Sequence, residues 1–255
     1  MNSKNINKVF VINAAGGNAT AIMLLKEPLS REEYAKIGKR MMNDFESFQV
    51  EQAGFLLLDT MHFEMSGGEF CGNAARAAAM LFFDLRQSNK FTMSGFLGEI
   101  VSRVKYTSTD KKIAEVSCDF PSLNPVPQLT DIKNTKIVDL GGIVHIVVND
   151  NFPKEDYQQI HTKLTERFNL QNKAAVGVVW YNISGNDARI DPVVWVKDID
   201  SFFYETSCGS GSIAVASVSG AENIFQPSGE KIIVKINNEG VNLKSDMEVI
   251  YESDD

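Results

Sequence analysis

The sequence contains few of the residues that build metal sites, disulfide frameworks or nucleic-acid interfaces. Its 255 residues include only three cysteines and three histidines, and the net charge is −8. The histidines lie far apart, with no carboxylate or thiol at ligand spacing, so we expect no metal site. Three cysteines are too few for a disulfide framework, so we expect free thiols. The chain has no basic run, which argues against a nucleic-acid partner.

Long apolar runs are also absent. No stretch approaches the roughly 18 residues that a membrane-spanning helix needs, and residues 1–10 lack the apolar core of a secretion signal. We therefore expect a cytoplasmic protein with no membrane contact. The remaining composition, 44% hydrophobic and 23% charged residues, is typical of a globular chain with one large domain or two smaller ones.

Strands and two kinds of helix alternate along the chain, and the same order occurs twice. Amphipathic helices are predicted at Ser30–Phe45, where Ser30 is a suitable N-cap, and at Lys154–Leu170. Apolar helices are predicted at Ala74–Leu85 and Ser212–Val218, and a helix that is apolar all round is expected to be buried. Each half therefore has strands, an amphipathic helix, more strands, a cysteine and a buried helix.

A proline-rich stretch, Pro121–Asp131, separates the two halves and is the best linker candidate. The sequence predicts an α+β fold built from a duplicated unit, with strands wrapped around a buried helix in each half. The predicted domains are residues 1–121, completed by the last strand at about 246–255, and residues 122–245.

A cysteine begins each buried helix and is followed at once by glycine and a polar residue. The two stretches are "CGNAAR", from Cys71, and "CGSGS", from Cys208, half a chain apart. N–H groups at a helix N-terminus attract anions and lower the pKa of a thiol. If a pseudo-twofold axis relates the halves, both helix starts face one cleft, with a sulfur on each side of a bound carboxylate. Such a pair of thiols could move an α-proton from one face of an amino acid to the other.

The α-proton of an amino acid is far less acidic than a thiol, so the carbanion needs fixed hydrogen-bond donors. We expect these donors to be main-chain N–H groups that hold the α-carboxylate, at Gly72, Asn73, Gly209 and Ser210. Nothing marks a lysine for a Schiff base, so we expect no cofactor. Three other interpretations stay open: cysteines that only pack the core, as we expect for Cys118, a phosphate-binding "CGSGS" loop, and a non-catalytic amino-acid binding protein.

The same motifs resemble those of the diaminopimelate epimerase structural superfamily of cofactor-independent epimerases and racemases. "GGEFCGNAAR" and "TSCGSGS" are similar to its two catalytic-cysteine signatures. "GGNAT" is similar to its N-terminal turn, which implies that Asn18 faces the substrate, and "FQPSGEKIIV" is similar to its late hairpin. The resemblance implies two pseudo-symmetric domains, each a mainly antiparallel strand barrel around a central helix. The resemblance also implies that a small amino-acid substrate binds between the two domains, with Cys71 and Cys208 as acid/base thiols. A homodimer is compatible with this family.

Within the superfamily, the closer likeness is to histidine racemases of opine-type metallophore pathways. They share "MSGxEFCGNA", an aromatic–Glu pair before "CGSG", here ending in Glu205, and a Glu-Gln-x-Gly-Phe stretch, here "EQAGF" from Glu51. The resemblance implies that Glu51 lies near the substrate's imidazole and that Glu205 also contacts the substrate. In diaminopimelate epimerases an arginine holds the distal carboxylate of the substrate, and this arginine is missing from "VWVKDIDSFFYETSC". Lys197 cannot replace it fully, because an ammonium group does not form the paired hydrogen bonds of a guanidinium group. Histidine is therefore the first candidate substrate.

Several relatives remain as alternatives. A diaminopimelate epimerase or another amino-acid racemase would use the same chemistry. Proline and hydroxyproline racemases normally carry histidine where Asn73 stands, and phenazine-pathway isomerases place an acid/base glutamate near Glu51 but lack the facing cysteine pair. His145 occurs across the fold at a strand position, so we expect a structural role for it.

Overall fold

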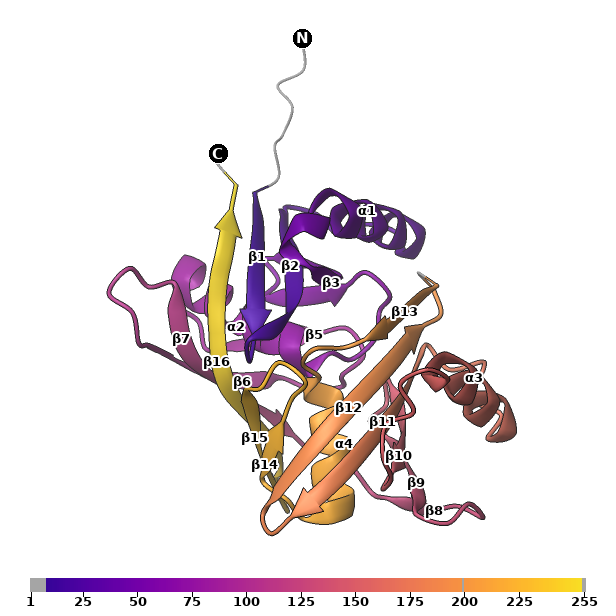
Figure 1. The fold of residues 1–255 in the computed structure, drawn as a ribbon. Coiled ribbons are helices and arrows are strands. Elements are labelled where there is room, and N and C mark those ends of the chain that lie inside the picture. The colour runs from indigo at the N-terminus through magenta and orange to yellow at the C-terminus, as the bar shows by residue number, and fades with distance from the viewer. Residues whose placement is uncertain (1–7, 199, 254–255) are drawn as a thin grey trace.

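The computed structural model describes residues 8–198 and 200–253. Figure 1 shows a mixed fold of strands and helices. The helices are α1 (Arg31–Asp44), the short 3-10 helix η1 (Glu46–Phe48), α2 (Gly72–Arg86), α3 (Tyr157–Arg167) and α4 (Gly209–Ser219). The strands are β1 (Val9–Ala14), β2 (Gly17–Leu25), β3 (Val50–Leu57), β4 (His62–Met65), β5 (Lys90–Met93), β6 (Ile100–Tyr106), β7 (Ile113–Pro121), β8 (Gln128–Leu129), β9 (Thr135–Asp139), β10 (Val144–Val148), β11 (Ala175–Ser184), β12 (Asp187–Val196), β13 (Ser201–Tyr204), β14 (Asn223–Phe225), β15 (Lys231–Asn237) and β16 (Gly240–Glu252).

The strands pair into one continuous sheet. Its order is β1-β2-β3-β4-β5-β6-β7-β16-β15-β14-β12-β11-β10-β9-β8, with β13 paired to β12. Strand β1 also pairs with β16, so β1 to β7 and β16 close into a ring. The pairings β2/β3, β4/β5, β10/β11 and β12/β14 are parallel, and the others are antiparallel. The predicted α+β class is confirmed, and β16 is the strand that joins the ring to the rest of the sheet.

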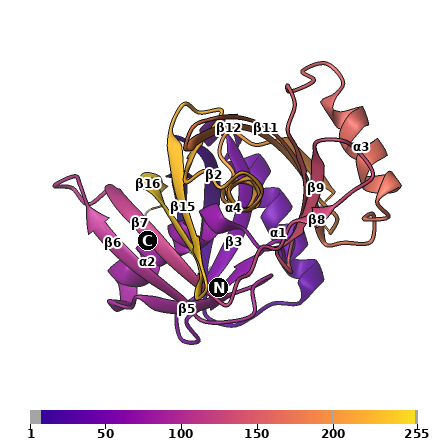
Figure 2. The same cartoon turned by 90° about the horizontal axis from the view of Figure 1, so that it is seen from below.

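Helices α2 and α4 lie inside the sheet, whereas α1 and α3 lie on its outer side (Figure 1). Figure 2 looks along α4 and shows strands β11, β12 and β15 around it. Helix α2 contacts β1, β6 and β7. The largest hydrophobic cluster contains residues of both inner helices, including Phe82 and Ile213, so the two helices share one core. This arrangement follows from their composition, since a helix without a polar face must be buried on all sides.

The helix boundaries have local causes. Ser30 caps α1 in a capping box, because its hydroxyl accepts from the Glu33 N–H while the Glu33 carboxylate accepts from the Ser30 N–H at 3.0 Å. Helix α3 begins at Tyr157, later than the predicted Lys154, because the N–H of Asp156 bonds to Pro153 O in a preceding turn. None of the helices in residues 8–198 and 200–253 combines the length and apolarity needed to cross a bilayer.

Candidate active site

The N-terminal ends of the two inner helices touch each other through glycine. A Cβ atom on Gly209 would lie 2.9 Å from the main-chain nitrogen of Asn73 and 2.9 Å from the carbonyl carbon of Gly72. A Cβ on Gly72 would lie 3.3 Å from the Gly209 Cα. The distances at Gly209 are shorter than real Cβ contacts, and the distance at Gly72 is tighter than an ordinary contact. The glycine after each cysteine thus permits the close approach of α2 and α4.

Each cysteine is the N-cap of its helix. Cys71 Sγ accepts from the Ala74 N–H with an S···N distance of 3.4 Å, and Cys208 Sγ accepts from the Gly211 N–H at 3.2 Å. Both caps have extended backbone, which turns the sulfur back over the first helical turn. Because the two helix ends touch, the two capping thiols belong to one site, and both are free.

A small cavity lies between the two cysteines. Its volume is about 20 Å³, which is room for about one water molecule. It is lined by Glu51, Gln52, Glu69, Phe70, Cys71, Ile143, Val194, Val196, Phe203, Glu205, Cys208, Gly209 and Ser210. A larger hollow of about 690 Å³ lies elsewhere, around β16 and the β6–β7 turn. We place the site at the small cavity because the capping thiols and three glutamates converge there.

Glu51 ties the two halves of the site together. Its Oε2 accepts from Asn18 Nδ2 at 3.0 Å, and its Oε1 accepts from the Thr206 hydroxyl at 2.7 Å. The Thr206 hydroxyl oxygen in turn accepts from the Asn18 N–H at 2.8 Å. Burial raises the pKa of Glu51 to about 6, against the opposing effect of these hydrogen bonds. Asn18 is thus connected to the site by its hydrogen bond to Glu51.

Gln52 is a site residue that the sequence analysis did not select. Cys71 Sγ donates to Gln52 Oε1 at 3.0 Å, and Gln52 Nε2 donates to the Thr20 hydroxyl at 2.8 Å and to Asn18 Oδ1. The only signal for it in the sequence is its position beside Glu51 in "EQAGF". The amide orients the Cys71 thiol but cannot take its proton at neutral pH.

Cys208 faces a different group, the carboxylate of Glu205. Burial and the nearby charge of Glu51 raise the pKa of Glu205 to about 8, while hydrogen bonds from Cys208 and Asn18 lower it. One thiol therefore has an amide partner, and the other has a carboxylate that is more basic than an ordinary glutamate. The two sides of the site are chemically unequal.

Both thiols are protonated in the ligand-free site. Burial and the charge of Glu205 raise the pKa of Cys71 to about 12, and the same two causes raise the pKa of Cys208 well above its usual value. The N–H groups of Ala74 and Gly211 lower these pKa values, as expected for helix N-termini, but burial has the larger effect. The lowered thiol pKa inferred from the helix ends alone does not hold without substrate.

The side chain of Asn73 does not reach the cavity. It is fully buried, its Nδ2 donates to Ser207 O at 2.9 Å, and its Oδ1 accepts from Arg76. This amide links the start of α2 to the residue before Cys208. Arg76 is also fully buried, and in the part of the chain that the structure describes its Nε and Nη1 have no hydrogen-bond partner.

Some of the other residues named in the sequence analysis line the cavity, and the rest lie outside its lining. Gly209 and Ser210 line the cavity, and the Ser210 hydroxyl lies 3.7 Å from Cys208 Sγ. Gly72 lies behind it, at the contact between the helices. Cys118 is buried in β7, and Lys197 is exposed after the end of β12. His145 is buried in β10, with no partner for either ring nitrogen among the described residues, and burial lowers its pKa to about 3.

Known proteins share both the sequence pattern and the fold. Residues 10–249 match the family model described as the histidine racemase CntK N-terminal domain. A histidine racemase from Fusobacterium nucleatum is 27% identical over 212 residues, which cover 80% of this chain and 78% of that protein. The solved structure of a predicted epimerase from Pseudomonas aeruginosa has a TM-score of 0.66 at 12% identity and covers 97% of this chain and 98% of that one. A phenazine biosynthesis PhzF family protein from Enterococcus faecalis has a TM-score of 0.55 at 14% identity, with the same shares covered. At these identities the two structures establish the fold only.

Proposed function

Because this chain belongs to the histidine racemase family represented by the CntK N-terminal domain, we propose that it interconverts L- and D-histidine by a two-thiol transfer of the α-proton. The observation that carries the mechanism is that two cysteines cap two touching helices and line one cavity. No cofactor is needed for such a transfer, because the two sulfurs supply both the base and the acid.

The substrate's α-carboxylate binds at the paired helix starts. The first N–H groups of a helix have no acceptor within the helix, and the two helix dipoles add to the attraction for an anion. In each helix the sulfur accepts from the third residue, and Cys71 also has a contact with the Asn73 N–H. The N–H groups of Gly72, Gly209 and Ser210 are therefore left for the substrate, and that of Asn73 is shared between Cys71 and the substrate. The same donors stabilise the carbanion as charge moves onto the carboxylate.

The unequal partners of the thiols define the starting protonation state. Once the substrate's ammonium group lowers its pKa and keeps it ionised, Glu205 accepts the proton of Cys208, and the resulting thiolate takes the α-proton from one face of the substrate. Cys71 keeps its proton through the hydrogen bond to Gln52 and gives it to the opposite face. The reverse reaction exchanges the two roles. Substrate binding favours the thiolate, because the ammonium group neutralises carboxylates that raise the thiol pKa values in the ligand-free site.

The site must open for histidine to enter, since a cavity of about 20 Å³ cannot hold an amino acid. The order of the strands and helices supports two units of similar build. The order β2, α1, β3 with a parallel pair is repeated by β10, α3, β11, and β4, α2, β5 is repeated by β12, α4, β14. We therefore propose that the chain forms two pseudo-symmetric domains, residues 1–121 with the end of β16 and residues 122–245. Their closure would exclude water from the carbanion.

The charges of the site favour histidine over diaminopimelate. Three glutamates line the cavity, whereas its lining within the described residues contains no lysine, arginine or histidine. A distal carboxylate would be buried beside these glutamates without a cation, which costs several kcal/mol. An imidazole would instead meet acceptors for its N–H groups.

The test is incubation of the purified protein with L-histidine or LL-diaminopimelate, followed by chiral chromatography. The proposal expects D-histidine to accumulate until the two enantiomers are equal, with little change in diaminopimelate. Faster epimerisation of diaminopimelate would replace the substrate assignment. Binding of histidine without any inversion would favour the non-catalytic alternative.

A further inference from the structure

A third carboxylate in the site, that of Glu69, has a free acceptor. The side chain is 5% exposed and lines the cavity together with both cysteines. Within the described residues its Oε2 has no hydrogen-bond partner. A buried carboxylate oxygen without a donor is costly, and a bound ligand that supplies an N–H group removes this cost.

The other two glutamates already have partners. Both oxygens of Glu51 accept hydrogen bonds from Asn18 and Thr206, and Glu205 accepts from Cys208 and Asn18. Glu69 comes two residues before Cys71, in the segment between β4 and α2. A Cβ on Gly67 would lie 2.5 Å from Glu69 Oε2 and 2.5 Å from Val196 Cγ1, so the free oxygen lies close to Gly67, on the side where Val196 lines the cavity.

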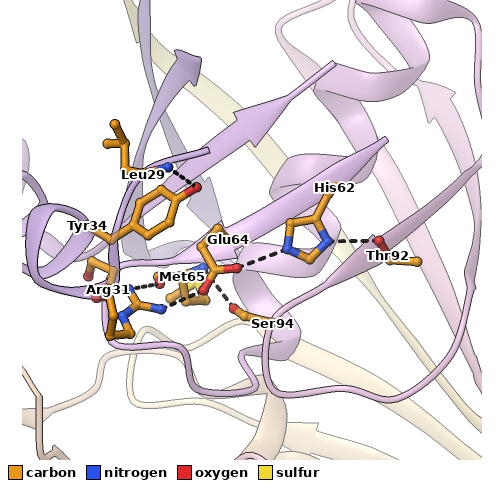
Figure 3. Close-up of polar contacts among 9 residues, drawn as sticks. Leu29, Arg31, Tyr34, His62, Glu64, Met65, Thr92 and Ser94 are labelled. Atoms are coloured by element: carbon orange, nitrogen blue, oxygen red, sulfur yellow. Dashed lines mark hydrogen bonds and ion pairs between the residues drawn. The ribbon is translucent and has the colours of Figure 1, made fainter. Parts of the chain in front are cut away.

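Arg31 holds the end of β4, just before the segment that carries Glu69, and Figure 3 shows its contacts with Glu64 and Met65. Arg31 Nη1 pairs with Glu64 Oε1 at 2.5 Å, and Nη2 donates to Met65 O at 2.8 Å and to Ser66 O. Glu64 Oε2 lies 2.9 Å from His62 Nε2, which extends the network along β4. These contacts fix the backbone just before Glu69, so its carboxylate meets a ligand in a prepared position.

The charges around Glu69 keep it available for a cation. Burial raises its pKa to about 7, and contacts with its own main-chain N–H and that of Gly67, together with the positive charge of Arg31, oppose this shift. Glu69 is therefore ionised at weakly alkaline pH, and within the described residues no donor meets Oε2 with full hydrogen-bond geometry. An imidazole N–H or another cationic group on a substrate side chain matches this need.

We propose that Glu69 is a specificity-determining residue that binds the N–H-bearing, basic side chain of the substrate and so selects histidine over amino acids with neutral side chains. This inference rests on the proposed racemase function. It moves the principal contact of the imidazole from Glu51, whose oxygens are already paired, to Glu69.

The experiment compares full-length wild type with Glu69→Gln and Glu69→Asp. Steady-state racemisation gives kcat and KM for L-histidine, and calorimetry gives Kd for L-histidine and L-phenylalanine at pH 8. Glu69→Gln should raise KM and Kd for histidine about tenfold or more, with kcat within about threefold, because the contact is made equally in the ground and transition states. The Kd for phenylalanine should not change, and Glu69→Asp should recover part of the loss.

Two control variants separate recognition from disturbance of the segment. Glu64→Gln weakens the ion pair with Arg31 without touching the cavity, and Glu99→Gln removes only an exposed ion pair with Lys90. Both should keep KM for histidine within about threefold of wild type, because in Glu64→Gln the amide oxygen still accepts from Arg31 while Arg31 keeps its bonds to Met65 O and Ser66 O, and the Glu99 pair is exposed. An equal rise of KM in Glu64→Gln and Glu69→Gln would overturn the proposal, and so would an unchanged Kd for histidine in Glu69→Gln. If wild type binds histidine but does not racemise it, the proposed function fails, and the binding data still decide the role of Glu69.

Discussion

Replacing Gly209 by alanine should push the starts of the two cysteine-bearing helices apart. The new Cβ would lie 2.9 Å from the Asn73 nitrogen and the Gly72 carbonyl carbon, whereas ordinary contacts begin near 3.4 Å. The opposing atoms belong mainly to the backbone of α2, so no side-chain rotation relieves the clash. The helices must separate by several tenths of an ångström.

Overpacking of this kind costs about 1–3 kcal/mol, and the better helix propensity of alanine returns less than about 1 kcal/mol. For a chain of this size, the resulting loss lowers Tm by about 2–6 °C. The effect on catalysis should be larger, because displacement of catalytic groups by a fraction of an ångström to 1 Å can cost up to about 100-fold in rate. We expect kcat for histidine to fall 10- to 100-fold.

Thermal unfolding and steady-state racemisation of Gly209→Ala measure both effects. Ser217→Ala in the same helix is the matched control, because it removes only a local hydrogen bond to Ala214 O and leaves the helix contact intact. The reasoning is refuted if Gly209→Ala keeps wild-type kcat and Tm, or if Ser217→Ala loses as much activity as Gly209→Ala.

Three further predictions concern Glu51, the two thiols and the buried carboxylates. Glu51→Ala should reduce kcat/KM for histidine at least tenfold, because Asn18 and Thr206 lose their shared acceptor; wild-type kinetics would contradict this. Iodoacetamide should inactivate the enzyme slowly, because both thiols are buried and protonated in the ligand-free site, and histidine should protect it by covering them; full activity after verified alkylation of Cys71 and Cys208 would exclude the mechanism. The ligand-free protein should lose stability as the pH rises from about 5 to 8, measured by urea unfolding. Over this range folded Glu69 and Glu205, with pKa values of about 7 and 8, hold protons that the unfolded chain has already released, and each such proton costs up to about 1.4 kcal/mol per pH unit until its folded pKa is passed. A rise in stability over this range would contradict the burial of these carboxylates.

Local chemistry made much of the site predictable. The sequence placed a cysteine at the start of each buried helix, and both Cys71 and Cys208 cap their helices. Ser30 was predicted as an N-cap, and it caps α1 together with Glu33, three residues further on. Composition alone indicated that α2 and α4 are buried.

The contacts that complete the site join residues far apart in sequence. The bond from Asn73 Nδ2 to Ser207 O spans 134 residues, and the bond from Thr206 to Glu51 spans 155. Spacing rules describe neighbours within a helix or hairpin and do not reach such pairs. The glycines of both motifs were interpreted only as part of an anion site, whereas the structure gives them a packing role.

The linker prediction shows the same limit. Composition marked Pro121–Asp131 as a break, yet Pro121 is the last residue of β7, and Gln128–Leu129 form β8 at the edge of the continuous sheet. Proline content indicates an interruption of regular structure. It does not predict which strands pair across the interruption.

The most direct test of the two-thiol mechanism is the reaction of L-histidine in D₂O, followed at early times by chiral separation and mass spectrometry. The two-thiol account predicts that newly formed D-histidine carries deuterium at Cα, while the remaining L-histidine still carries protium. It also predicts that Cys71→Ser and Cys208→Ser each abolish the formation of D-histidine, because serine cannot act as a base of this strength at neutral pH. D-histidine that keeps the original proton, or turnover within about tenfold of wild type in either variant, would contradict the mechanism.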